Sequence, residues 1–278
     1  MKIGGMSDLA RLQVLKGRAV DTRAFLDKAA RELTTNQKAS RYEATGGNLT
    51  RLFALERSID RNAVFSENVS LTELRLDVMQ ESLGRILTPV EALAVDLTTS
   101  VNLGDRSAAE IHAAAARGTF EVAVGALNKA VAGQSLFAGT GTDGAALAPA
   151  AAILADLDAL TAAAPDAAGV IAAVEGYFEK GPPPGAFYTT GYIGSVDDMS
   201  AVEVGEGQRL DYALRADSDE VVAVLEALAL AAVVDGGALA GVPGDRMTVL
   251  GESGARLLAR TEGLMAVSYT HLTLPPMQ

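Results

Sequence analysis

The sequence predicts a mainly α-helical protein, built as an elongated long-helix bundle or coiled-coil rod with a small β-rich insertion. Apolar residues recur at heptad spacing over long stretches of the N-terminal half. The chain is rich in Ala and Leu, aromatic residues make up only 5%, and tryptophan is absent. This composition is typical of closely packed helices rather than of a sandwich or barrel. Most of the strand-type signals lie in one region, between Ala186 and Ala216.

The first helix is expected from Ser7, a plausible N-cap, to about Leu33. Its apolar residues form a heptad seam, with Leu15, Thr22 and Ala29 between them and the charged residues largely off the seam. The residues that recur every seventh position are Leu12, Ala19, Leu26 and Leu33. The polar stretch from Thr34 to Gly47 then breaks the pattern.

A second helix is expected from about Asn48 to Val101. Its strongest part has apolar residues with gaps that alternate between three and four: Leu76, Met79, Leu83, Ile86, Val90, Leu93 and Leu97. Thr88-Pro89-Val90-Glu91 matches a helix start, so the helix either kinks at Pro89 or stops and restarts there. Unbroken, it would be about 80 Å long, against a radius of gyration of about 19 Å for a compact chain of this size. The protein should therefore be a rod, at least in part.

A third helix is expected to begin at a capping box, Ser107-Ala108-Ala109-Glu110, and to run to about Ala132. Gly133 would end it as a helix-terminal glycine.

The middle of the chain changes character. Gln134 to Ala150 is typical of a turn or hairpin, and two short helices should follow, near Ala151–Ala164 and Asp166–Phe178. A Gly-Pro-Pro-Pro-Gly break at 181–185 precedes the expected strands. The strand candidates are Phe187–Thr190, Val202–Val204 and Leu210–Leu214.

Helix is expected again from Asp217 to Val234 and from about Asp245 to Leu264. Val267 to Gln278 carries no Lys, Arg, Asp or Glu and contains a proline pair, so we expect it to be a non-native tail. The predicted organisation is an N-terminal helical rod (1–133), an outer insertion (134–216), incomplete return helices of the rod (217–266) and the tail (267–278).

Composition limits the available chemistry. The chain has 278 residues, enough for one large domain or two modest ones, and 23 basic against 35 acidic residues. The net charge of −12 argues against a general binder of nucleic acid or anionic membranes. Cysteine is absent, which excludes disulfides, thiol nucleophiles and cysteine-ligated metals. The only two histidines, His112 and His271, offer little for a metal or catalytic site.

Targeting signals are missing as well. No stretch reaches the roughly 18 apolar residues of a membrane span, and the first eight residues have no apolar core of a signal peptide. We expect the chain to stay in the cytoplasm or to leave it by a route that needs no cleavable signal.

One motif suggests a cofactor. Gly139-Thr140-Gly141-Thr142-Asp143-Gly144 has the dinucleotide-binding pattern, but that site needs a buried strand before the loop and a helix after it. A long helix precedes this loop, so a turn is the favoured interpretation. The acid pairs Asp197-Asp198 and Asp217/Asp219 are typical of a turn and of a helix start. We therefore expect no catalytic, cofactor or metal residues.

Several segments together resemble a known family. They are Glu32–Thr35, Gly46–Leu52, Ala126–Asn128, Gly133–Asp143 and Leu214–Ser218. In this order they are similar to the bacterial flagellar hook-associated protein 3 family, the hook–filament junction proteins of the flagellin-like group. The most specific piece, Leu136 to Thr140, is similar to that family's leucine–phenylalanine–x–glycine–threonine stretch. The resemblance covers most of residues 6–265. It departs at Asn36, where the family has Gly, and from Val267 onward, where the family has a long helix that pairs with the N-terminal one.

The resemblance implies a non-catalytic structural subunit of the bacterial flagellum at the hook–filament junction. Such a subunit is secreted by the flagellar export apparatus, with an export chaperone, and packs on like subunits and other axial proteins, namely the neighbouring junction protein and flagellin. It needs no cofactor, binds no nucleic acid and is not inserted in a membrane. The expected assembly interface consists of the two heptad seams named above. The alternatives are a cytoplasmic coiled-coil or signalling protein and a nucleotide-binding enzyme that uses the Gly139–Gly144 loop.

Overall fold

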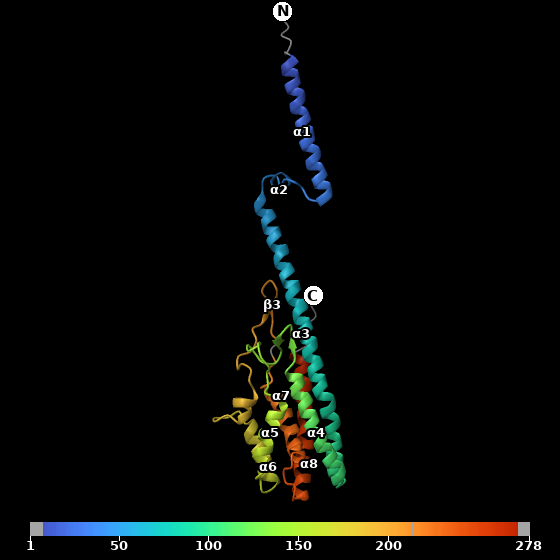
Figure 1. The fold of residues 1–278 in the computed structure, drawn as a ribbon, viewed down its shortest axis with the longest axis vertical. Helices are drawn as coiled ribbons and strands as arrows, with labels where there is room; N and C mark the ends of the chain where they lie inside the picture. The colour runs from blue at the N-terminus through green and yellow to red at the C-terminus, as the bar shows by residue number, and fades with distance from the viewer. Residues whose placement is uncertain (1–7, 213, 272–278) are drawn as a thin grey trace, which may run out of the picture. The chain divides into compact units, whose positions relative to one another are not determined.

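The computed structural model describes residues 8–212 and 214–271, of which Arg41 and 267–271 by their backbone only. It confirms a mainly α fold (Figure 1). The helices are α1 Asp8–Thr35, α2 Arg41–Ala44, α3 Leu49–Asn102, α4 Arg106–Leu127, α5 Ala150–Thr161, α6 Ala167–Phe178, the π-helix η1 Phe187–Gly191, α7 Asp219–Asp235 and α8 Pro243–His271. The strands form two antiparallel pairs, β1 Ala130–Val131 with β2 Gln134–Ser135 and β3 Val202–Gly205 with β4 Gln208–Leu210. The chain divides into two compact units, Met1–Val64 and Phe65–Gln278.

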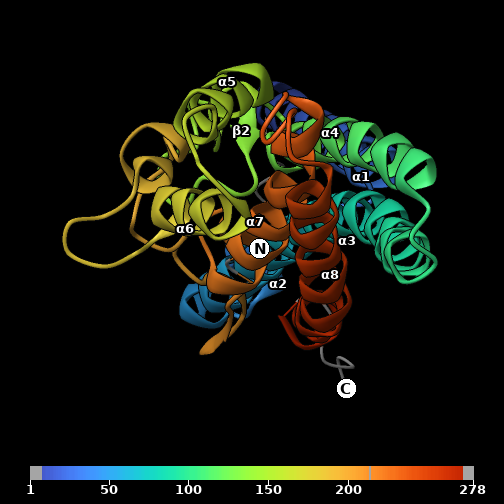
Figure 2. The ribbon, with the colours of Figure 1, turned by 90° about the horizontal axis from the view of Figure 1, so that it is seen from below.

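Helix α7 lies at the centre of the second unit. Every residue from Ala227 to Val234 is buried, so the helix is apolar on all sides. A helix of this kind has to be enclosed by other elements. In Figure 2, which views the bundle end-on, α7 lies among α4, α5, α6 and α8. The Ala/Leu/Val run of the sequence is thus the core around which the other helices pack.

Polar contacts tie the outer helices to α7. The Arg256 guanidinium on α8 forms ion pairs at 2.6 Å with Glu226 of α7 and at 2.6 Å with Glu175 of α6. On the other side of α7, Arg117 of α4 pairs with Asp158 of α5 at 2.7 Å and donates a hydrogen bond to a carbonyl of α7. The buried Ser253 hydroxyl donates to the Ala227 carbonyl at 2.6 Å. These groups fix which faces of the surrounding helices meet the central one.

Helix α3 continues through Pro89 without stopping, so the alternative of a restart at that residue is wrong. Proline removes one backbone hydrogen bond from a helix. Its neighbours Ile86 and Val90 are 2% and 0% exposed, and their burial in the core holds the helix together at this point. Helix α8 approaches α3 closely through two glycines, Gly251 against Val101 and Gly254 against Thr98.

The β-rich insertion is smaller than predicted. Strand Val202–Val204 is confirmed as β3, which pairs with β4. Phe187–Thr190 is not a strand but belongs to η1, where the Phe187 ring lies 5.0 Å from that of Phe178 on α6. Burial of this aromatic pair against a helix favours the helical turn over an extended strand. Of the third candidate only Leu210 is in a strand: it is the last residue of β4 and pairs with Val202, the first residue of β3, so the ladder ends there.

The predicted helix ends need corrections. The N-cap of α4 is Asp105, whose carboxylate accepts from the Ala108 amide at 3.0 Å, in place of the expected box at Ser107. The same helix ends at Leu127, and Gly133 lies instead in the turn between β1 and β2 with φ of +78°. Helix α8 runs beyond Leu264 to His271. The expected cap Ser7 and the end of the expected tail, 272–278, lie outside the described residues.

The contact between α8 and α3 leads to a testable prediction. A Cβ atom added at Gly254 would lie 2.9 Å from Thr98 Oγ1 and 3.2 Å from its backbone N. We expect Gly254→Val to lower the free energy of unfolding by about 1–3 kcal/mol, because the two backbones would have to separate. The matched control is Gly263→Ala on the same helix, where nothing lies within 4 Å of the added atom. It should be neutral or raise stability by up to about 1 kcal/mol. Urea denaturation followed by circular dichroism checks both, and equal effects would contradict the close packing.

Two buried tyrosines give a second prediction. Burial raises the pKa of Tyr177 and Tyr192 from 10.0 to about 12. Below pH 10 both phenols are neutral in the folded and unfolded states, but between about pH 10 and 12 the unfolded chain loses these protons first, so stability should fall as pH rises. Replacing either by Phe should lessen this alkaline loss.

The two tyrosines differ at neutral pH. Within the described residues the Tyr177 hydroxyl has no hydrogen-bond partner, whereas that of Tyr192 donates to the Ser195 carbonyl at 2.7 Å. Tyr177→Phe should therefore leave the free energy of unfolding at pH 7 unchanged or raise it, and Tyr192→Phe should lower it by about 1 kcal/mol. Urea titrations at pH 7 and 11 test this. A larger loss for Tyr177→Phe than for Tyr192→Phe would contradict the assignment.

Candidate assembly surface

Helix α1 exposes the first predicted seam. None of the residues of α1, all of which the structure describes, is buried. Leu12 is 66% exposed, Leu26 60% and Leu33 86%, and Ala19 between them is exposed too. Most of the stability of a helix in a protein comes from packing of its apolar face, and each leucine left in solvent forgoes about 1.5–3 kcal/mol of burial. The seam is thus an exposed apolar stripe on a helix without buried residues.

The first part of α3, which belongs to the same unit, adds further exposed apolar side chains. Phe53 is 49% exposed, and Leu55 and Ile59 are each 59% exposed. The sequence analysis did not single out these residues. The gaps of three and four between Leu52, Leu55 and Ile59 carry the same heptad signal and would have identified Leu55 and Ile59, although not Phe53. Exposed apolar residues gathered in one unit are typical of an interaction site.

The second predicted seam has a different environment. Its seven residues are between 0% and 5% exposed and belong to the chain's own core: Leu76, Met79, Leu83, Ile86, Val90, Leu93 and Leu97. This corrects the expected interface, because side chains that pack inside the second unit are not available to another chain unless that core opens. Only the α1 seam lies on the surface.

A polar turn connects α1 to α2. The Glu32 carboxylate accepts from the Ala39 amide at 3.0 Å, which lowers the pKa of this carboxyl, and it also pairs with Lys38 at 3.3 Å. Lys28 of α1 pairs with Glu43 of α2 at 2.7 Å, and this contact raises the pKa of the lysine. Asn36 has φ of +52°, in the left-handed region that favours glycine. These contacts hold the α2 turn against the C-terminal part of α1.

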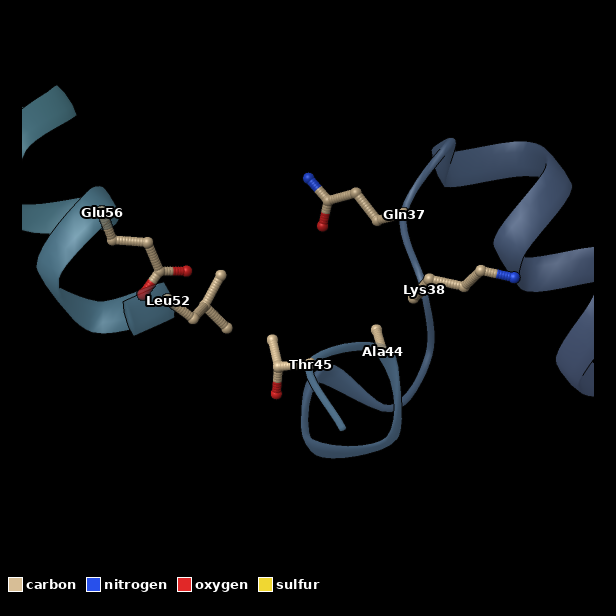
Figure 3. A pocket seen from close by; sticks show the side chains of 6 residues that line it. All are labelled: Gln37, Lys38, Ala44, Thr45, Leu52 and Glu56. Atoms are coloured by element: carbon tan, nitrogen blue, oxygen red, sulfur yellow. The ribbon is translucent and has the colours of Figure 1, made fainter. Parts of the chain in front are cut away.

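A shallow pocket of about 250 Å³ lies within the first unit (Figure 3). Its lining comes from the α2 turn and α3 and mixes short, apolar and charged side chains: Gln37, Lys38, Ala44, Thr45, Leu52 and Glu56. The Lys38 ammonium is engaged by Glu32. Such a lining has neither the apolar enclosure nor the converging polar groups of a typical small-molecule site.

At the glycine loop Gly139–Gly144, two loops of the chain cross each other and are joined by backbone hydrogen bonds. The Thr140 amide donates to the Asp197 carbonyl at 3.0 Å, and the Ser195 amide donates to the Ala138 carbonyl at 2.9 Å. A Cβ atom at Gly139, whose φ is +60°, would collide with the carbonyl oxygens of Ser195 and Asp197. The glycine is therefore required by the approach of two loops, and this loop neither follows a buried strand nor opens a helix at Gly144. Its geometry does not match a phosphate cradle.

Three of the four acidic candidate residues form ion pairs. The Arg215 guanidinium pairs with Asp198 at 2.5 Å and with the buried Asp217 at 2.6 Å, and Lys180 pairs with Asp219 at 2.8 Å. His112 is half-buried on α4, and the side chain of His271 lies outside the described residues. Among the described residues, no three His, Asp or Glu side chains are placed to hold a metal ion. None of the helices within residues 8–212 and 214–271 has the length and hydropathy of a membrane span.

Comparisons with known proteins leave the family open. No family model and no curated protein matches the chain. One solved structure, described as a flagellar hook-associated protein from Vibrio parahaemolyticus, is similar to this chain. The match covers 80% of this chain and 90% of that protein. The two are 14% identical and superpose with a TM-score of 0.44. Similarity at this level carries no conclusion about the fold or function of this chain.

Proposed function

We propose that the chain is a non-catalytic structural subunit of the bacterial flagellum, placed at the hook–filament junction. The single observation that carries the proposal is α1, a helix of 28 residues whose seam is exposed along its length. An ordinary globular protein would bury such a seam in its core. A subunit that assembles with others leaves it free for them.

The resemblance of the sequence segments adds the flagellar context. Gly133–Asp143 is similar to the family's most specific stretch, and in the structure its Gly139 makes a crossing that no other residue type would fit. In this proposal the chain leaves the cell through the flagellar export apparatus, helped by a chaperone. It then packs through α1 on neighbouring axial proteins and like subunits.

Localisation distinguishes this proposal from a cytoplasmic coiled-coil protein. In the source bacterium, an epitope-tagged chain should be found in flagella sheared from the cells and purified, close to the hook end in immunogold images. Retention in the cytosol, with none in purified flagella, would contradict the proposal.

The α1 seam should decide incorporation. We expect Leu26→Asp to remove the chain from purified flagella, because a carboxylate in the middle of a helix–helix contact costs several kcal/mol unless it is paired. The matched control is Leu103→Asp, at a residue that is 78% exposed in the turn after α3. It should be incorporated like the wild type. Both variants should keep the helical circular dichroism of the wild type, and equal incorporation of both would count against the seam.

A further inference from the structure

The residues that flank the α1 seam are basic. If Leu12, Leu15 and Ala19 take positions a, d and a of the heptads, the seam is flanked by the two g positions directly before Leu12 and Ala19 and by the two e positions directly after Leu15 and Thr22. These four positions hold Arg11, Lys16, Arg18 and Arg23. Between Leu9 and Ala30 the acidic residues of α1, Asp21 and Asp27, take positions c and b instead. The positive charges thus border the apolar seam on both sides.

These four cations are open to a partner. All four are exposed, and none of them forms an ion pair within the described part of the chain. The charge is also unequal along the sequence. Residues 1–64 contain 12 basic and 7 acidic residues, whereas residues 65–278 contain 11 and 28. The four basic residues therefore belong to a unit with a positive net charge, whereas the net charge of the rest of the chain is negative.

We propose that the partner of α1 is a helix with an apolar heptad seam flanked by Asp and Glu. The proposal rests on the proposed function, which gives α1 a partner, and adds the chemistry that selects it. Charges at e and g face each other across a coiled coil and set partner choice. A second copy of α1 is disfavoured, because parallel pairing would place Arg11 beside Lys16 and Arg18 beside Arg23 of the other copy.

Designed peptides test the charge selection on the full chain. The probe is a synthetic helix of about 28 residues with Leu at a and d and Glu at e and g. Its twin carries Lys at e and g. We expect the Glu peptide to bind at least about tenfold more tightly than the Lys peptide in calorimetry. The preference should shrink between about 50 and 500 mM NaCl, because salt screens exposed charge pairs.

Charge reversal supplies the matched controls. Arg18→Glu with Arg23→Glu should shift the preference toward the Lys peptide. Arg31→Glu with Arg51→Glu changes the net charge by the same amount, but at exposed residues that do not flank the α1 seam. This double variant should keep the preference for the Glu peptide. Circular dichroism verifies that both double variants keep their helices.

The outcomes separate the two proposals. Equal binding of both peptides would overturn the charge selection and leave the seam as an assembly surface. Binding of neither peptide would count against the seam and so against the proposed function. Stronger binding to vesicles of phosphatidylcholine and phosphatidylglycerol than to the Glu peptide would overturn the proposal in favour of an anionic lipid surface.

Discussion

Burial of α7 on all of its sides is the constraint on which the second unit depends. A helix whose residues from Ala227 to Val234 are all buried has no face left for water. Four helices have to surround it, and the few polar groups at their contacts need partners inside the bundle. Arg256 meets this requirement by joining Glu226 of α7 to Glu175 of α6. The arrangement of the surrounding helices thus follows from the single apolar segment Ala227–Val234.

The same kind of heptad pattern has two outcomes in this chain. In the later part of α3 the seam is buried against its own chain, with α8 brought close at Gly254. In α1 none of the described elements buries the seam, and its leucines are exposed. Apolar area that folding does not bury remains available for association. The second unit therefore buries its seam in its own core, whereas the α1 seam of the first unit is exposed.

The glycine-rich loop beside the bundle has the sequence pattern of a nucleotide-binding site, but its glycine serves a close approach of two loops. Gly139 has no side chain because the carbonyls of Ser195 and Asp197 pass where a Cβ atom would stand. Arg215 then closes the crossing by pairing with Asp198 and Asp217. A glycine-rich pattern alone does not separate phosphate binding from a close backbone approach, since both need a missing side chain. The elements before and after the loop distinguish the two roles: here no buried strand precedes it and no helix begins at Gly144.

The sequence by itself determined the mainly α fold, the regions of the main helices and the position of β3, because heptad spacing, caps and turn residues act over a few neighbouring residues. It did not decide that α3 continues through Pro89 or that Phe187 enters a π-helix, because core burial outweighs local preference at both. Nor did it decide which seam is core. Leu26 and Leu83 have the same heptad environment in the sequence, yet one is 60% exposed and the other 0%. That difference depends on which distant helices fold back on each, and only the tertiary structure contains this information.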